Sequence, residues 1–250
     1  IVPFVFLFEL EKLKSELKSD IKTFIILSFL IGLSLFLGSA LQQVALLYTD
    51  VANAAFFTIF YVPMVPIIIF LFRKRSIHWS VWPSVVLCLV GGYLLTNFQD
   101  ATVRFGDSLI VLGALFWSTH IIFTGIIVIK YNLPLTLGAI QTLIVASFSF
   151  LIGSIYEEFI YVDIIKEIYS ILYAGILSGG FAFVLQIYAQ KNITPAPAAI
   201  IFSLEGVFAT IAAWYLLNQI LDINNLLGCF FILCGVLLSQ LLPLLKKRYS

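Results

Sequence analysis

The chain has 250 residues, of which 62% are hydrophobic and only 11% are charged, and its formal net charge is +1. Soluble domains carry about a quarter charged residues, so a soluble fold of this length could not bury so much apolar surface, and we expect the lipid bilayer to be its solvent. The few basic residues lie beside apolar segments and form no independent basic face, which argues against nucleic acid as a partner.

The predicted elements begin with residues 1–8, which are apolar but too short to cross a membrane. We interpret them as the end of a helix whose beginning is missing. Eight apolar segments follow, each close to the ~20 residues that a helix needs to cross the hydrocarbon core. Strands of a membrane barrel would be about half as long and would alternate apolar with polar residues. The segments are 23–47, 51–72, 80–98, 107–129, 133–155, 168–189, 196–217 and 226–245. The sequence therefore predicts an all-α polytopic membrane helix bundle, with eight full transmembrane helices and an N-terminal stub.

The positive charge alternates between the connections. All but two of the 14 Lys and Arg residues fall in every second connection, and the two exceptions are Arg104 and Lys166. Short basic loops stay on the cytoplasmic side of a membrane. The basic residues in question are Lys12, Lys14, Lys18, Lys22, Arg73, Lys74, Arg75, Lys130, Lys191, Lys246, Lys247 and Arg248, whereas Asp50, Asp100 and Asp107 lie in the intervening connections. We therefore predict a multi-pass protein of the inner or plasma membrane with a cytoplasmic C-terminus.

The chain also resembles itself at a shift of 144 residues. This register pairs Gln42 with Gln186 and Gly91 with Gly235, and it superimposes the last three segments on the first three. The shift spans five crossings, and an odd number of crossings reverses direction, as in the inverted repeats of secondary transporters. We expect a parent of two inverted five-helix repeats. Residues 1–98 would hold the first, without its first helix and most of its second, and residues 107–246 the second.

Ionisable groups within the membrane are costly, and they are often functional. Glu205 is the one carboxylate well inside a segment, and His120 lies near the middle of another. Glu205 would either face a cavity, binding substrate or carrying a proton, or form a bond that holds two helices together. His120 would either titrate and bind substrate or bond to a neighbouring helix. A direct pair between the two would change both interpretations.

Several amides lie in the apolar segments. Gln42 and Gln186 hold equivalent places in the two halves, which favours a cavity over simple interhelical bonding for this pair. Asn53, Gln141 and Tyr61 complete the set of candidate cavity residues.

Four prolines are candidate helix kinks. Proline removes a backbone donor and bends a helix. Pro63 and Pro66 interrupt one segment, and Pro195 and Pro197 begin its partner in the repeat.

Motifs for other chemistries are missing from the sequence. Cys88, Cys229 and Cys234 lie in apolar segments without metal-ligand spacing, and we interpret them as small packing residues. There is no phosphate-binding loop and no protease motif. We expect no cofactor and no metal ion.

At this point the residues resemble a known group. Residues 54–66, AAFFTIFYVPMVP, are similar to the first-half signature of EamA-type transporters of the drug/metabolite transporter superfamily. Residues 198–209, AAIIFSLEGVFA, resemble the second-half signature, and Gly106-Asp107-Ser108 resembles the start of the second repeat. The chain departs from the pattern at Gly206, where the family usually has Pro, and at Asn218-Gln219, where it often has Gly-Glu.

The resemblance implies a secondary active transporter and not an enzyme. Its substrates would be small metabolites, amino acids or drugs, often exported, and alternating access between the inverted halves would move them. Protons are the candidate coupling ion, with Glu205 as their carrier. The alternatives are a passive facilitator or channel, an intramembrane enzyme that uses Glu205 and His120, and a membrane scaffold.

Overall fold

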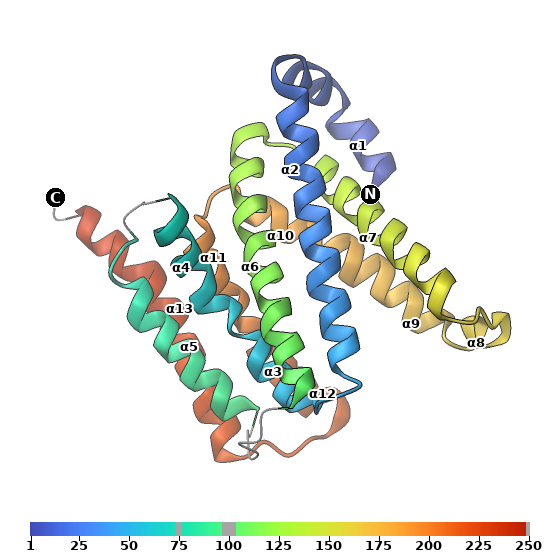
Figure 1. Ribbon diagram of the computed structural model, residues 1–250. Helices are drawn as coiled ribbons and strands as arrows, with labels where there is room; N and C mark the ends of the chain where they lie inside the picture. The colour runs from blue at the N-terminus through green and yellow to red at the C-terminus, as the bar shows by residue number, and fades with distance from the viewer. Residues whose placement is uncertain (74–76, 97–103, 249–250) are drawn as a thin grey trace. The chain divides into compact units, whose positions relative to one another are not determined.

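The computed structural model describes residues 1–73, 77–96 and 104–248, and every regular element within these ranges is a helix. Lys74, Arg75 and Asp100, together with the last two residues of the expected segment 80–98, lie outside the described residues. The helices, labelled in Figure 1, are α1 (Val2–Phe8), α2 (Leu10–Ala45), α3 (Val51–Thr58), α4 (Tyr61–Arg73), α5 (Val81–Leu95), α6 (Phe105–Tyr131), α7 (Pro134–Tyr156), α8 (Tyr161–Lys166), α9 (Ile168–Leu172), the π-helix η1 (Tyr173–Ala182), α10 (Phe183–Ala189), α11 (Pro195–Phe202), α12 (Leu204–Leu217) and α13 (Ile223–Arg248).

Seven stretches of the described chain are helical, apolar and long enough to cross a membrane. They are Asp20–Ala45, Val51–Phe72, Phe105–Tyr131, Pro134–Tyr156, Ile168–Ala189, Pro195–Leu217 and Ile223–Leu245. This finding confirms the all-α membrane class. The expected count of eight full crossings is not reached. The helix formed by the expected segment 80–98, α5, has only 15 described residues and is too short to be counted.

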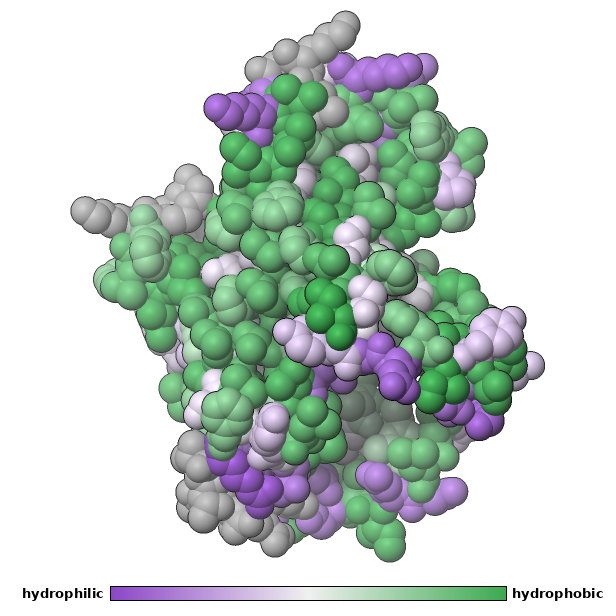
Figure 2. Space-filling model, turned by 45° about the vertical axis from the view of Figure 1, so that its right-hand side comes forward, coloured by the Kyte–Doolittle hydropathy of each residue, from purple (hydrophilic) through white to green (hydrophobic). Residues whose placement is uncertain are grey.

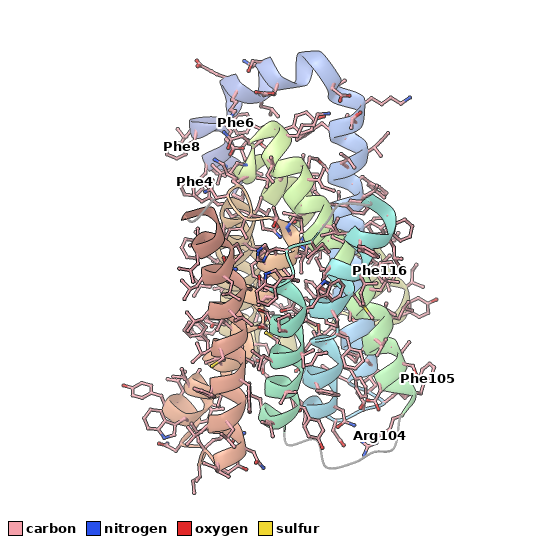
Figure 3. All side chains as sticks on the ribbon, turned by 90° about the vertical axis from the view of Figure 1, so that its left-hand side faces the viewer. Phe4, Phe6, Phe8, Arg104, Phe105 and Phe116 are labelled. Carbon is pink, nitrogen blue, oxygen red and sulfur yellow. The ribbon has the colours of Figure 1, made fainter. Side chains whose placement is uncertain are left out.

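The surface is that of a protein solvated by lipid. Hydrophobic residues cover most of the face shown in Figure 2. Many helices carry large apolar side chains on the outer surface. Phe72 of α4, for example, is 81% exposed. Figure 3 shows Phe4, Phe6 and Phe8 projecting from the short helix α1, and all three are more than half exposed.

The chain divides into two compact units. Unit 1 comprises residues 1–37 and 123–193, and unit 2 comprises residues 38–122 and 194–250. Each unit draws on both predicted halves, because the long helices α2 and α6 each contribute to both units. The division into repeats at residues 1–98 and 107–246 stays a prediction about the sequence.

Unit 1 has an apolar core that ends in a polar cluster. Phe24 and Ile31 of α2 pack with Ile127 and Tyr131 of α6, and the Phe24 and Tyr131 rings meet edge to face. Beyond them, the ammonium group of Lys130 donates to Asp20 at 2.7 Å, and the Tyr131 hydroxyl donates to the same carboxylate at 3.2 Å. This cluster places residues 20 and 130 at one end of unit 1.

A carboxylate from a different part of the chain caps helix α7. Glu9 is only 7% exposed and accepts the backbone N–H groups of Leu135 and Thr136, at 3.0 and 2.8 Å. It also accepts the Thr136 hydroxyl at 2.7 Å. The first N–H groups of a helix have no partner within the helix, so Glu9 supplies one and anchors the start of the chain to α7.

Unit 2 has a comparable cap at the start of α6. Asp107 is 1% exposed and accepts the Thr49 hydroxyl at 2.5 Å and the Arg104 backbone N–H at 2.8 Å. Arg104 in turn pairs with Asp50 at 2.5 Å. The remaining helices of unit 2 include α5 and α13, which lie side by side in Figure 1 and contact each other through small residues.

Candidate functional site

Unit 2 contains a cavity of about 640 Å³ that combines an apolar wall with many polar groups. Its lining comes from the end of α2, from α3 and α4, from the end of α5, from α11 and α12, and from the first turn of α13 with the segment that precedes it. The polar lining residues are Gln42, Thr58, Tyr61, Thr96, Ser203, Glu205, Thr210, Gln219 and Asn225.

Two transmembrane helices are interrupted at the wall of this cavity. The first interruption separates α3 from α4 at Ile59–Phe60, and the second separates α11 from α12 at Ser203. Ile59 and Ser203 both line the cavity, and they are 144 residues apart, which is the register of the predicted repeat. The two interruptions therefore lie at equivalent positions of the sequence.

Each interruption has its own local cause. Pro63 has no N–H to donate to the carbonyl of Ile59, and Val62 takes that carbonyl instead, three residues on, at 2.9 Å. In the second half Ser203 bonds backwards through its hydroxyl to the carbonyl of Ile200 at 2.6 Å. Backward bonds of Ser and Thr compete with the helical pattern. The second interruption therefore forms without a proline, since Gly206 stands where the family usually has Pro.

Three of the four prolines expected to kink helices do not lie at an interruption. Pro195 and Pro197 lie in the first turn of α11, where a missing N–H costs nothing. Pro66 lies inside α4, which continues to Arg73. Only Pro63 directly follows a break.

Glu205 lies in the first turn of α12 and opens into the cavity. Its side chain is exposed there, and no described residue forms a hydrogen bond or an ion pair with its carboxylate. A carboxylate is favoured in the first turn of a helix, because the N-terminal end carries partial positive charge. The helix therefore supports the negative charge and leaves the oxygens open to a solute.

The hydroxyl groups around Glu205 act as acceptors. Thr210 donates its proton to the carbonyl of Gly206 at 2.8 Å, Thr58 donates to Ala54 at 2.7 Å, and Thr96 donates to Gly92 at 3.0 Å. A hydroxyl whose proton is already used offers only its lone pairs to a further partner. These three oxygens add to the acceptor groups of the cavity.

The structure brings three of the seven candidate residues to this cavity. Gln42, Tyr61 and Glu205 line it together. From the sequence we did not propose Thr58, Thr96, Thr210, Gln219 or Asn225 as cavity residues, because single hydroxyls and amides also form ordinary bonds within and between membrane helices. Ser203 and Glu205 both lie in residues 198–209, the second-half signature, so that motif was the one sequence signal for this part of the cavity.

The other four candidates lie elsewhere. Asn53 is buried in α3 at 4% exposure, and His120 is fully buried in α6 with its ring edge-on to Trp117 at 6.2 Å. Gln141 of α7 is fully buried, and Gln186 belongs to α10; both are in unit 1. None of the four lines this cavity.

Unit 1 has a second cavity, of about 700 Å³, between α1, α7, η1 and α10. Its wall is almost wholly apolar, and Thr142 is the single residue with a polar side chain among those that line it. The Thr142 hydroxyl is bonded to the carbonyl of Gly138 at 2.8 Å. No ionisable side chain is among the described residues that line this cavity. In the described residues, no group of three or more His, Cys, Asp or Glu side chains could hold a metal ion.

Comparison with known proteins agrees with this architecture. The model of the EamA-like transporter family matches residues 104–241. An uncharacterized transporter of Archaeoglobus fulgidus is 31% identical over 215 residues, which cover 85% of this chain and 68% of the relative. The uncharacterized transporter YoaV of Bacillus subtilis is 26% identical over 251 residues, covering 94% of this chain and 81% of YoaV. A solved crystal structure shares the fold with a TM-score of 0.73 at 16% identity, over 94% of this chain and 80% of that one.

Proposed function

Because the chain belongs to the EamA-like transporter family and is a multi-pass membrane transporter of small solutes, we propose that the cavity of unit 2 is its substrate site and that it works by alternating access. The observation that carries this proposal is the pair of interrupted helices at the cavity wall, beside the open carboxylate of Glu205. Interrupted helices form the substrate and ion sites of many secondary transporters.

The inverted repeat is part of the same proposal. Ile59 and Ser203 are related by the 144-residue register, so each half would supply one interrupted helix to the site. Two copies of one structure in opposite orientations can exchange inward-open and outward-open shapes. This relationship supports alternating access over a static pore.

Glu205 is the proposed carrier of a coupling proton. It is the one carboxylate in the described lining of the cavity, and it keeps its oxygens open to solute. A proton and a substrate that compete for the same carboxylate would be moved in opposite directions, which suits an exporter driven by the proton gradient. We propose export of small metabolites, amino acids or drugs across the plasma membrane, with the C-terminus in the cytoplasm.

The experiment is solute flux in proteoliposomes that contain the purified chain, with a mixture of radiolabelled amino acids and small amines as probes. An imposed proton gradient should drive accumulation of at least one probe, and dissipating the gradient should abolish it. Glu205→Gln should remove the gradient dependence, because it replaces the titratable carboxyl with a neutral amide.

Ala209→Trp is the matched test of the route. Ala209 lines the cavity, and an indole at this position would fill it. Ala139→Trp places the same bulk in the apolar cavity of unit 1 and should leave flux in place. Flux that survives Ala209→Trp would contradict the proposed site. Flux that equilibrates without accumulation would identify a passive facilitator.

A further inference from the structure

The charge of the unit 2 cavity is unbalanced. Among its described lining residues, Glu205 carries the single negative charge, and Lys, Arg and His are absent. Gln219 stands where the family often has Glu, so the lining has one negatively charged side chain and not two. A charge in a poorly hydrated site interacts more strongly with an opposite charge than it would in water. The site therefore favours a solute that brings one positive charge.

The hydrogen-bonding groups of the cavity point to the same class of solute. The hydroxyl protons of Thr58, Thr96 and Thr210 are donated to backbone carbonyls, which leaves three acceptor oxygens. Together with the Glu205 carboxylate, they offer several acceptor atoms to a solute. A solute with several N–H groups would satisfy more of them than one with a carboxylate.

The rest of the wall fits an apolar body. Val51, Ile59 and Leu95 line the cavity, and the aromatic rings of Tyr61 and Phe202 join them. An aromatic face also attracts an ammonium group. The cavity volume of about 640 Å³ accommodates a molecule of this kind.

We infer that the unit 2 cavity selects small organic cations that carry a primary or secondary ammonium group on an apolar body. The ammonium group binds the Glu205 carboxylate and donates its remaining protons to threonine oxygens such as that of Thr210. This inference rests on the proposed substrate site and names the class of solute that the site recognises.

The test measures binding to the purified chain in detergent micelles through the rise in its melting temperature. The probes are two matched sets: 2-phenylethylammonium with 3-phenylpropionate and 3-phenylpropionamide, and tryptamine with indole-3-propionate and indole-3-propionamide. Each ammonium compound should stabilise the protein at roughly tenfold lower concentration than its acid or amide, since charge-assisted hydrogen bonds are about twice as strong as neutral ones.

Two variants locate the preference. Glu205→Gln should erase the tenfold difference. Thr210→Val keeps the shape of the side chain but removes its acceptor oxygen, and it should weaken ammonium binding severalfold without affecting the amides. Thr142→Val removes an equivalent hydroxyl, also bonded four residues back at 2.8 Å, from the apolar cavity of unit 1 and should change nothing.

Acids or amides that bind as well as the ammonium compounds would overturn the inference, as would an ammonium preference that survives both Glu205→Gln and Thr210→Val. The proposed function fails separately. If Ala209→Trp blocks the flux of a neutral or anionic probe, transport through the cavity stands and the cation selectivity falls. If the ammonium probes bind as expected but no probe crosses the membrane, the selectivity stands and transport falls.

Discussion

Gly91 of α5 and Gly228 of α13 face each other so closely that a Cβ atom on either would lie 2.7 Å from the carbonyl oxygen of the other. Further along the same pair of helices, a Cβ atom on Gly235 would lie 2.9 Å from the carbonyl oxygen of Ser84. The 144-residue register converts Gly91 into Gly235 and Ser84 into Gly228, so each contact is the image of the other. This exchange supports the proposed inverted repeat.

We expect Gly228→Ala to destabilise the protein by about 1–3 kcal/mol, since overpacking forces backbone atoms apart. The added methyl group would meet backbone atoms of Gly91 and Leu95, which cannot move aside as a side chain can. Gly175→Ala is the control, because no heavy atom lies within 4 Å of a Cβ atom at that position. Unfolding in mixed micelles measures both variants, and equal stabilities would contradict the close contact.

Removal of the Glu9 cap should also cost stability. Glu9→Ala leaves the N–H groups of Leu135 and Thr136 without their acceptor, and each unsatisfied buried group costs about 1–3 kcal/mol. Glu9→Gln retains one acceptor oxygen and should lose less. Glu11 is exposed in the next turn, so Glu11→Ala should be neutral. The prediction is wrong if Glu9→Ala and Glu11→Ala melt at the same temperature.

Asn225 joins two helices at the cavity. Its amide donates to the carbonyl of Leu95 at the end of α5, at 3.2 Å, while its carbonyl oxygen accepts the N–H of Asp222 at 3.1 Å. Asn225→Asp keeps the second bond and loses the first. We expect faster amide hydrogen exchange in residues 92–96 and 223–229 and unchanged exchange in unit 1. Uniform exchange rates in the variant and the parent would show that the bond does not hold the two helices together.

The predicted topology is open to a direct test. Reporter fusions at residues 48–50 and at residues 190–192 should report opposite compartments. Five predicted crossings separate these two connections, and an odd number of crossings changes the side of the membrane. The basic connection at Lys191 should be cytoplasmic. Fusions that report the same side would overturn both the topology and the inverted repeat.

Most of the membrane-spanning helices could be predicted from the sequence, because a long apolar segment has to satisfy its own backbone hydrogen bonds within the bilayer. The expected segments 107–129 and 133–155 became Phe105–Tyr131 and Pro134–Tyr156, within two residues at each end. The interruption at Ser203 could not be predicted, because it depends on a side-chain bond and not on a proline. Nor could the π-helix η1, since its residues have the composition of an ordinary membrane helix.

The site was harder to predict than the fold. Glu205 and Gln42 line the cavity, while the equally polar His120 is buried in α6 away from it. Helices that are apolar all round carry no stripe that shows which face points to the core. Packing against neighbours decides that question, so polarity identified the candidates but not their surroundings.

The most direct test of the central claim is the accessibility of a single cysteine at position 209, in a background where Cys88, Cys229 and Cys234 are replaced by alanine. Sealed vesicles of known orientation are exposed to a membrane-impermeant maleimide, added to one side at a time. If the unit 2 cavity lies on the route that solutes take across the membrane, Ala209→Cys will be labelled from both sides. Labelling from one side alone, whichever side it is, would contradict the account.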